Sequence, residues 1–365
     1  MEERIIIVDY MHLVYSYSFA QYNITAYVEI DGRAKEVSTK LHKGISNVIN
    51  TWTRGGKDKV IVCVDSPIIS RKAYFNRINK EKGVEKTYKE GRKNLPDSIL
   101  ESAEQVLDLL RDAGIPVCRG YDYEADDLIF NVVCQCKDLY PDTPIDIITN
   151  DADLLPLVDQ QVSVFLRSVR FTSATEKRLE KKHYVQITPD NFEQEVIQRG
   201  EYKKIRMPYN TTLLYKLLRG DKSDNIIGYP KKFTPKKYNE MIEKMEADDV
   251  DFANIFRYGR IEKKFINKKT GDVVVDINQV DPKECKVVFS KPSTLEGILN
   301  VMSKYTDEDV LKHIEQTYRG LNLNGVFMEN GQVRIPARVK ELPKTYSQDR
   351  LMEVLKKWNV KIARR

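Results

Sequence analysis

The sequence predicts an α/β fold in which a mostly parallel central sheet is flanked by helices. Three short, largely β-branched runs carry this prediction, at residues 5–8, 60–64 and 145–149. Near-continuous apolar runs of this length are typical of strands buried on both faces. Each run is closely followed by aspartate, namely Asp9, Asp65 and then Asp151 with Asp153. Ligands of open α/β sheets bind beyond the carboxyl ends of the strands, so we expect the functional site at this edge.

The residues between these runs predict the covering helices. Ser98 and Glu101 have the spacing of a capping box, and Gly114 stands where the following helix should stop. Residues 115–118 resume as a short strand. The apolar residues between the two helix signals recur at helical spacing: Ile99, Ala103, Val106, Leu107 and Leu110. This alternation of strand and helix supports the parallel sheet.

Composition places the chain among globular proteins. Its 365 residues suggest two or three domains, and an apolar share of 41% is enough for a core. No stretch reaches the roughly 18 apolar residues of a membrane span, and the start lacks the long apolar segment of a signal peptide. Five cysteines without a Cys-x-x-Cys pair favour a reducing, cytoplasmic compartment. We therefore expect a cytoplasmic protein with no membrane partner.

Residues 71–93 form a basic segment. They hold nine Lys or Arg and three Glu, and this difference of +6 equals the net charge of the whole chain. Tyr74, Phe75 and Tyr88 are interleaved with the charges, a pattern that suits single-stranded nucleic acid. Taken alone, however, the segment is better explained as a solvated Lys-rich helix.

Acidic residues gather elsewhere. Residues 121–127 open a predicted helix with Glu124, Asp126 and Asp127 in or beside its first turn. An acid-rich helix start is common because the helix dipole favours it. Here, however, four segments bring at least seven carboxylates towards one sheet edge. Two like charges about 4 Å apart repel by ~1 kcal/mol in water and ~4 kcal/mol at an effective dielectric near 20, so this pattern predicts bound cations.

The ligand type indicates the metal. Carboxylates without thiolate or imidazole suit Mg²⁺ or Mn²⁺ rather than zinc, and His12, near Asp9, more often packs than ligates. Two such ions about 3.5–4 Å apart would support phosphodiester hydrolysis. The chain has no P-loop and no Gly-x-Gly-x-x-Gly fingerprint, so nucleotide triphosphate or dinucleotide binding has no support.

Four motifs in order carry a resemblance to a known family. They are Tyr-Lys-Glu-Gly-Arg at 88–92, Tyr-Glu-Ala-Asp-Asp at 123–127, Thr-Asn-Asp-Ala-Asp-Leu-Leu at 149–155, and Leu-Leu-Arg-Gly-Asp-Lys-Ser-Asp-Asn-Ile at 217–226. Together they resemble the structure-specific 5′ nucleases, which include flap endonucleases, the 5′-nuclease domain of DNA polymerase I, and phage 5′-exonucleases and ribonuclease H. A chain of this length looks most like the phage members.

The resemblance implies a PIN-like sheet with a helical arch and a helix-turn-helix-type DNA-binding subdomain. The implied domains are 1–185 for catalysis, with the arch at 68–97, then 186–255 for duplex binding and 256–365 as an extension packing on the core. The implied metal-site acids are Asp9, Asp65, Glu124, Asp126, Asp127, Asp151, Asp153, Asp221 and Asp224. Asp151 and Asp153 are also expected to be catalytic. Arg71 and Lys72 are the candidates for contacting the scissile phosphate, and Arg77 could take one role.

The sequence departs from the family after residue 228. The family's glycine-rich hairpin, which binds a monovalent cation, is replaced by a lysine-rich stretch, so we expect direct lysine–phosphate contacts there. The expected nucleic-acid-binding residues are Arg77, Lys89, Arg92, Lys231, Lys232, Lys236 and Lys237.

The expected function is metal-dependent 5′-3′ exonuclease or flap endonuclease activity during replication, with Mg²⁺ or Mn²⁺ as cofactor. The expected partners are DNA with a 5′ flap or nick and RNA–DNA hybrids, with a single-strand binding protein or sliding clamp as further candidates for a monomeric enzyme. A non-catalytic DNA-junction binding protein and a PIN-like single-strand ribonuclease are the alternatives. The presence of all the family acids disfavours the junction-binding protein, and the element at residues 220–225 disfavours the single-strand ribonuclease.

Overall fold

The structure is a computed structural model. It describes residues 2–18, 25–30, 33–66, 70–91, 95–168, 183–199, 202–229, 231–260, 263–274, 281–289, 293–323 and 339–358. The chain forms two compact units. The first unit comprises Met1–Ile68, Gly91–Asn191 and Arg338–Arg365, and the second comprises Ile69–Glu90 and Phe192–Ala337. Both units are discontinuous along the chain, so they do not correspond one to one with the three predicted ranges, which stay predictions.

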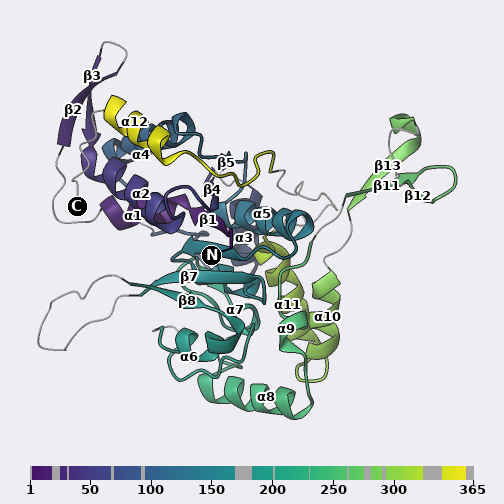
Figure 1. Ribbon diagram of the computed structural model, residues 1–365. Helices are drawn as coiled ribbons and strands as arrows, with labels where there is room; N and C mark the ends of the chain where they lie inside the picture. Colours follow the sequence, from purple (N-terminus) through teal and green to yellow (C-terminus); the bar gives the residue numbers. More distant parts are fainter. Residues whose placement is uncertain are drawn as a thin grey trace, which may run out of the picture. The chain divides into compact units, whose positions relative to one another are not determined.

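A six-stranded sheet forms the centre of the first unit (Figure 1). Its order is β5-β4-β1-β6-β7-β8. The strands are β1 (Ile5–Asp9), β4 (Lys59–Val64), β5 (Val117–Arg119), β6 (Ile145–Thr149), β7 (Val162–Ser168) and β8 (His183–Ile187). Only β8 pairs antiparallel to its neighbour; the other pairs are parallel. The predicted mostly parallel sheet is confirmed.

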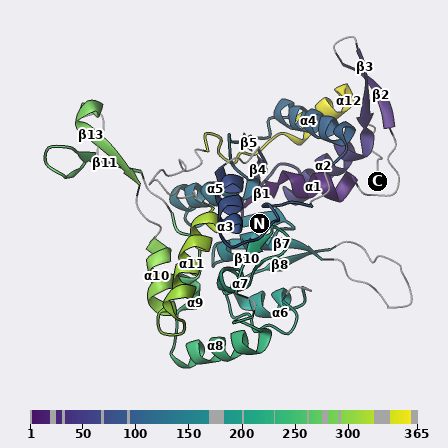
Figure 2. The same cartoon turned by 180° about the vertical axis from the view of Figure 1, so that it is seen from behind.

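Helices cover both faces of this sheet, as the two opposite views show (Figure 1, Figure 2). Side chains alternate along a strand, so Ile6 and Val8 of β1 share one face. They pack in one apolar core with residues of α1 (Tyr10–Ser18), α2 (Thr39–Trp52), α4 (Asp97–Asp112) and α12 (Gln348–Lys357). On the other side α5 (Ala125–Leu139) contacts β1 and β4. The central strands are therefore buried on both faces, which is why they are almost wholly apolar.

The start of α4 corrects one sequence prediction. The predicted capping box at Ser98 is wrong, because the N-cap is Pro96 and the helix begins at Asp97. The carbonyl of Pro96 already accepts from the amides of Ile99 and Leu100, at 2.9 and 3.1 Å, which places Ser98 inside the first turn. The five predicted apolar residues of α4 are all buried. Gly114 follows the helix with φ of 83°, as the predicted stop requires.

The remaining elements of the first unit are short. β2 (Thr25–Ile30) and β3 (Arg33–Ser38) pair as an antiparallel hairpin, and η1 (Ala152–Leu157) and η2 (Pro189–Asn191) are 3-10 turns. No described helix is both long and apolar enough to cross a membrane.

The second unit is mainly helical and carries two small separate sheets. Its helices are α3 (Ser70–Glu81), α6 (Phe192–Val196), α7 (Thr212–Arg219), α8 (Pro235–Ala247), α9 (Phe252–Ile255), α10 (Ser293–Met302) and α11 (Glu308–Leu321). Its strands are β9 (Gly220–Asp221) with β10 (Ile226–Ile227), and β11 (Lys263–Asn267) between β12 (Val273–Val274) and β13 (Cys285–Phe289), which follows the 3-10 turn η4 (Pro282–Glu284). The core of this unit holds the fully buried rings of Tyr202, Tyr238 and Tyr318.

Candidate active site

The strand ends bring the first acids to one edge of the sheet. Asp9 is the last residue of β1, which lies between β4 and β6 and runs parallel to both. Asp65 directly follows β4, and Asp151 comes two residues after β6. Because parallel strands end at the same edge, the fold delivers these three carboxylates to one place, as the sequence predicts.

Hydrogen bonds join the segments that carry the acids. The Thr149 hydroxyl donates to Asp9 Oδ2 at 2.7 Å, which links β6 to β1. The Ala125 amide donates to Asp65 Oδ1 at 2.6 Å, which links the end of β4 to the start of α5. The Ser66 amide donates to the carbonyl of Tyr123 at 3.0 Å beside it. The geometry of the edge is thus fixed by bonds between segments far apart in sequence.

The first turn of α5 supplies three further acids in different settings. Glu124 is the N-cap residue and Asp126 is half-buried in the first turn. Asp127 is fully buried, and its carboxylate accepts from the Glu124 amide at 3.0 Å. Asp127 therefore helps to begin the helix, where the helix dipole also favours negative charge.

Asp151 and Asp153 lie at the start of η1. Asp151 is its N-cap, and its Oδ1 accepts from the Asp153 amide at 2.9 Å. The Asp151 amide in turn donates to the Thr149 hydroxyl at 3.0 Å. Thr149 thus connects Asp9 with Asp151, a role that the sequence analysis missed. A hydroxyl residue at the end of a buried strand is the signal that could have revealed it.

The negative charges of these acids shift one another's pKa values. Burial and the neighbouring Asp65 raise the pKa of Asp9 to about 7. The hydrogen bonds from the Thr149 hydroxyl and the His12 amide act in the opposite direction but are outweighed. Burial also raises the pKa of Asp126 well above its usual range, and Asp151, Asp9, Glu124 and Asp65 add to the shift. Carboxyls from all four segments are therefore close enough to repel, and a bound cation would relieve the repulsion.

These side chains fit an oxygen-seeking divalent ion. Among the described residues, no three His, Cys, Asp or Glu side chains converge as a ready-made cage. Mg²⁺ does not require one, because it keeps several waters and takes one or two carboxylates together with substrate phosphates. The donors at this edge are all carboxylate oxygens, which suits Mg²⁺ or Mn²⁺.

His12 lies beside this edge and contacts Tyr184 of β8. Its Nε2 is 2.8 Å from the Tyr184 hydroxyl, and its backbone amide donates to Asp9 Oδ1 at 3.2 Å. Burial and the nearby Arg167 lower the pKa of His12 to about 4. The neutral ring therefore packs against β8, as expected for this histidine.

Comparison with known proteins decides the family. Residues 4–196, which contain all the acids described above, match the family model "5'-3' exonuclease, N-terminal resolvase-like domain". The chain belongs to this exonuclease family. It is 33% identical over 167 residues to a 5'-3' exonuclease of Mycoplasma pneumoniae, covering 46% of this chain and 50% of the relative. It is 29% identical over 199 residues to DNA polymerase I of Caldicellulosiruptor bescii, covering 52% of this chain and 21% of the polymerase. The chain thus spans at most about half the length of these two relatives.

Solved structures match the chain at low identity and with TM-scores below 0.5. A zinc-bound T5 5'-exonuclease is 14% identical, with a TM-score of 0.46 and coverage of 88% of both chains. The catalytic core of Rad2 in complex with DNA substrate is 13% identical, with a TM-score of 0.42 and coverage of 98% of this chain and 88% of the other. The predicted resemblance to 5′ nucleases is confirmed by the family match.

The second unit of this exonuclease-family chain carries the other predicted acids, beyond the matched residues. Asp221 accepts from Lys216 Nζ at 2.7 Å and from the Ser223 amide and hydroxyl at 2.8 and 2.6 Å. Burial opposes ionisation, but Lys216 and Ser223 outweigh it and hold the pKa of Asp221 at about 2. Asp224 is buried, with Lys89 Nζ 3.8 Å away. Their assignment as metal-site acids stays a prediction.

The first half of the basic segment folds into α3. Arg71 is buried there and Lys72 is exposed, and their contact with a scissile phosphate stays a prediction. Arg77 pairs with Glu81 at 2.9 Å. The interleaved aromatics are not a stacking platform, which corrects the sequence interpretation. Tyr74, Phe75 and Tyr88 are at most 5% exposed, because their rings pack inside the second unit.

The end of the basic segment is tied to the 221–225 turn. The Lys89 amide donates to the carbonyl of Asp224 at 3.0 Å, and Asn225 Nδ2 donates to the carbonyls of Thr87 and Glu90. Arg92 lies outside the described residues. Lys231, Lys232, Lys236 and Lys237 lie at or before the start of α8 and are exposed, and Lys232 pairs with Asp307. Binding of nucleic acid by these residues stays a prediction.

Proposed function

We propose that this chain is a divalent-metal-dependent 5′ nuclease. It hydrolyses phosphodiester bonds at 5′ ends, flaps or RNA primers on duplex DNA and acts in replication. The observation that carries the proposal is the mutual repulsion of carboxyls from four segments, within residues that match the exonuclease family. A protein that only binds DNA gains nothing from such acids, because they repel phosphates as well as each other.

Mg²⁺ or Mn²⁺, with two ions bound, would supply an activated water and stabilise the leaving oxygen. Asp9, Asp126 and Asp151 are the residues best placed to hold the ions, because each is electrostatically coupled to the others. Thr149 orients Asp9 through its hydroxyl, and Asp65 fixes the start of α5 through the Ala125 amide. Asp127 keeps Glu124 and Asp126 in place through its bond to the helix start.

Basic residues of the second unit complete the proposal. Arg71 and Lys72 stabilise charge on the scissile phosphate, and the lysines at the start of α8 contact the duplex backbone directly. A monomeric state, a single-strand binding protein or sliding clamp as partner, and a phage origin stay predictions.

Cleavage of three labelled substrates tests the proposal. A 5′-labelled flap, a nicked duplex and an RNA–DNA hybrid are each incubated with protein in Mg²⁺ or in EDTA. Release of short 5′ products that EDTA abolishes supports the nuclease. A mobility shift with no cleavage under any metal would establish the junction-binding alternative. Cleavage of a separately labelled single-stranded RNA, with none of these three substrates cut, would establish the ribonuclease alternative.

A further inference from the structure

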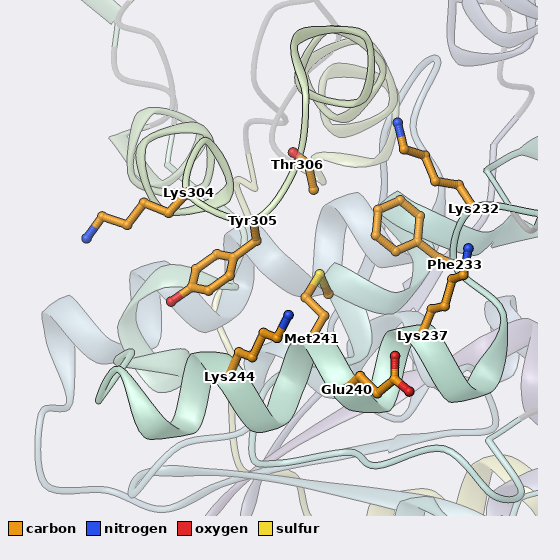
Figure 3. Close-up of a pocket in the computed structure, with 9 residues that line it drawn as sticks. All are labelled: Lys232, Phe233, Lys237, Glu240, Met241, Lys244, Lys304, Tyr305 and Thr306. Carbon is orange, nitrogen blue, oxygen red and sulfur yellow. The ribbon is translucent and has the colours of Figure 1, made fainter.

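A hollow in the second unit is lined by lysines from two separate parts of the chain (Figure 3). One wall is the face of α8 and the residues before it, and the other is the turn between α10 and α11. It encloses about 330 Å³. Its lining residues are Lys232, Phe233, Lys237, Glu240, Met241, Lys244, Lys304, Tyr305 and Thr306.

The helical spacing of α8 places the residues with which it lines the hollow on one face of the helix. Lys237, Met241 and Lys244 follow at intervals of four and three residues, which is the repeat of neighbouring helix turns. Figure 3 shows Met241 and Phe233 between Lys244 on one side and Lys232 and Lys237 on the other. Phe233 and Met241 are only 6% and 7% exposed, so they form an apolar floor.

Two contacts hold the opposite wall in place. The Tyr305 hydroxyl donates to Asp248 Oδ2, just past the end of α8. Lys232 pairs with Asp307, which is also the N-cap of α11. The turn that carries Lys304 is thus anchored at both ends, and the hollow does not depend on one flexible side chain.

The charges of the hollow do not balance. Glu240 has Lys236 at 3.8 Å, and Lys232 has Asp307. Within the described part of the chain, Lys237, Lys244 and Lys304 form no side-chain ion pair. Three ammonium groups therefore surround one hollow without a carboxylate of their own. An anion in the hollow would therefore meet three ammonium groups that no carboxylate of the described chain pairs.

We propose that this hollow binds phosphates of a nucleic-acid backbone, through Lys244 and Lys304 in addition to the predicted Lys237. The identification of the ligand as nucleic acid rests on the proposed function. Lys237 and Lys244 are two turns apart, a rise of about 10 Å along α8, so the ammonium groups are spread along the hollow. A repeating polyanion can neutralise all three together, whereas a single free phosphate cannot. The apolar floor offers a surface for the sugar between phosphates.

Salt dependence of duplex binding tests the proposal. Binding of a labelled duplex is measured by fluorescence anisotropy in EDTA, between 50 and 200 mM salt, for wild type and Lys244→Ala/Lys304→Ala. Each lost phosphate contact lowers the log–log slope by about 0.9, so we expect a decrease of about 1.8. The affinity ratio between wild type and variant then shrinks about tenfold across this fourfold range of salt.

A matched variant separates this site from general surface charge. Lys283→Ala/Lys312→Ala removes two exposed lysines of the same unit outside the hollow. We expect its slope to equal that of wild type. An unchanged slope in the Lys244/Lys304 variant, or an equal change in both variants, would overturn the proposal.

Titration calorimetry with inorganic phosphate distinguishes the source of the anion. We expect no saturable uptake at sub-millimolar concentration. Uptake that the Lys244/Lys304 variant loses would show a free-phosphate site and refute the backbone assignment. Because the binding assay contains EDTA, it does not depend on cleavage. A chain that never cleaves but shows the slope change would refute the nuclease and leave this inference standing.

Discussion

Asp9 in the first unit and Asp221 in the second are about equally buried, with 8% of the residue and 10% of the side chain exposed. Their pKa values nevertheless move in opposite directions. Burial and Asp65 raise the pKa of Asp9 to about 7. At Asp221 burial acts the same way, but Lys216 and Ser223 outweigh it and lower the pKa to about 2.

The two carboxylates differ in the source of the positive charge that balances them. Asp221 has a lysine of its own chain at 2.7 Å, so its charge is already balanced. Asp9 has other carboxyls as neighbours, and under the proposed function a bound cation balances its charge. Two acids that look alike in the sequence therefore differ in their surroundings: Asp221 has a partner lysine, and Asp9, under the proposed function, is a ligand for a cation. The predictions below test this division.

The largest expected effect is on catalysis. Asp126→Asn removes the carboxylate whose pKa is raised by burial and by the charges of Asp151, Asp9, Glu124 and Asp65. We expect the rate of Mg²⁺-dependent cleavage to fall by about 10³-fold, corresponding to a barrier increase of ~4 kcal/mol. Single-turnover cleavage of the labelled flap measures it. Asp142→Asn, at an exposed turn position, is the control and should cleave at the wild-type rate. Full activity in Asp126→Asn would remove this acid from the metal site.

A second prediction concerns stability without metal. The folded-state pKa of Asp9 is about 7, above its usual 3.8, so the folded chain holds a proton that the unfolded chain has lost. This contribution is fully present below pH 3.8 and is lost as the pH rises through 7, at a cost of up to about 4 kcal/mol. We expect urea unfolding in EDTA to show wild type losing stability between pH 4 and 8 relative to Asp9→Asn.

Magnesium provides the matched comparison for this prediction. Mg²⁺ at pH 8 should restore stability to wild type and much less to Asp9→Asn, since the variant has lost both the charge and the need to balance it. Parallel pH profiles for the two proteins in EDTA would contradict the assignment of Asp9 as an uncompensated acid.

The third prediction addresses the other side of the comparison. Asp221→Asn deprives the Lys216 ammonium, whose side chain is 9% exposed, of its carboxylate. We expect the free energy of unfolding to fall by about 3 kcal/mol at neutral pH. The lowered pKa means that this stability is present above pH 3.8 and lost as the pH falls through 2. Urea unfolding measures both effects.

The double variant Lys216→Gln/Asp221→Asn is the control for this pair. Removing both charges leaves no unbalanced ammonium, so part of the lost stability should return. If Asp221→Asn instead behaves like Asp9→Asn and stabilises the metal-free protein, Asp221 would belong with the acids that need a cation.

The sheet and its acidic edge could be predicted because their signals are local. A buried parallel strand is apolar along its whole length, and the aspartate at its end marks the edge directly, as at Asp9 and Asp65. The helical spacing of α4 was equally informative, since all five of its predicted apolar residues are buried.

Features that depend on distant partners could not be predicted. Phe75 is buried because Gly320 of α11, far along the chain, lies against its ring; a Cβ at Gly320 would lie 2.4 Å from that ring. The Tyr74 hydroxyl likewise donates to the carbonyl of Gln316 at 2.8 Å. A basic segment with aromatics therefore looked like a binding surface, while its rings belong to a core. The lysine beside Asp221 was hidden for a different reason, because a helix turn, not the motif itself, brings it there.

The smallest expected effect separates Asp127 from the acids around it. Its carboxylate accepts from the Glu124 amide at 3.0 Å, so Asp127→Ala leaves a helix-start amide without its acceptor and should cost about 1 kcal/mol. Asp127→Asn keeps an acceptor oxygen and should recover most of that stability in thermal unfolding. Calorimetric uptake of Mn²⁺ should weaken less in Asp127→Asn than in Asp126→Asn. Equal losses of Mn²⁺ affinity would mean that the Asp127 charge, and not its bond to the helix start, is what the site requires.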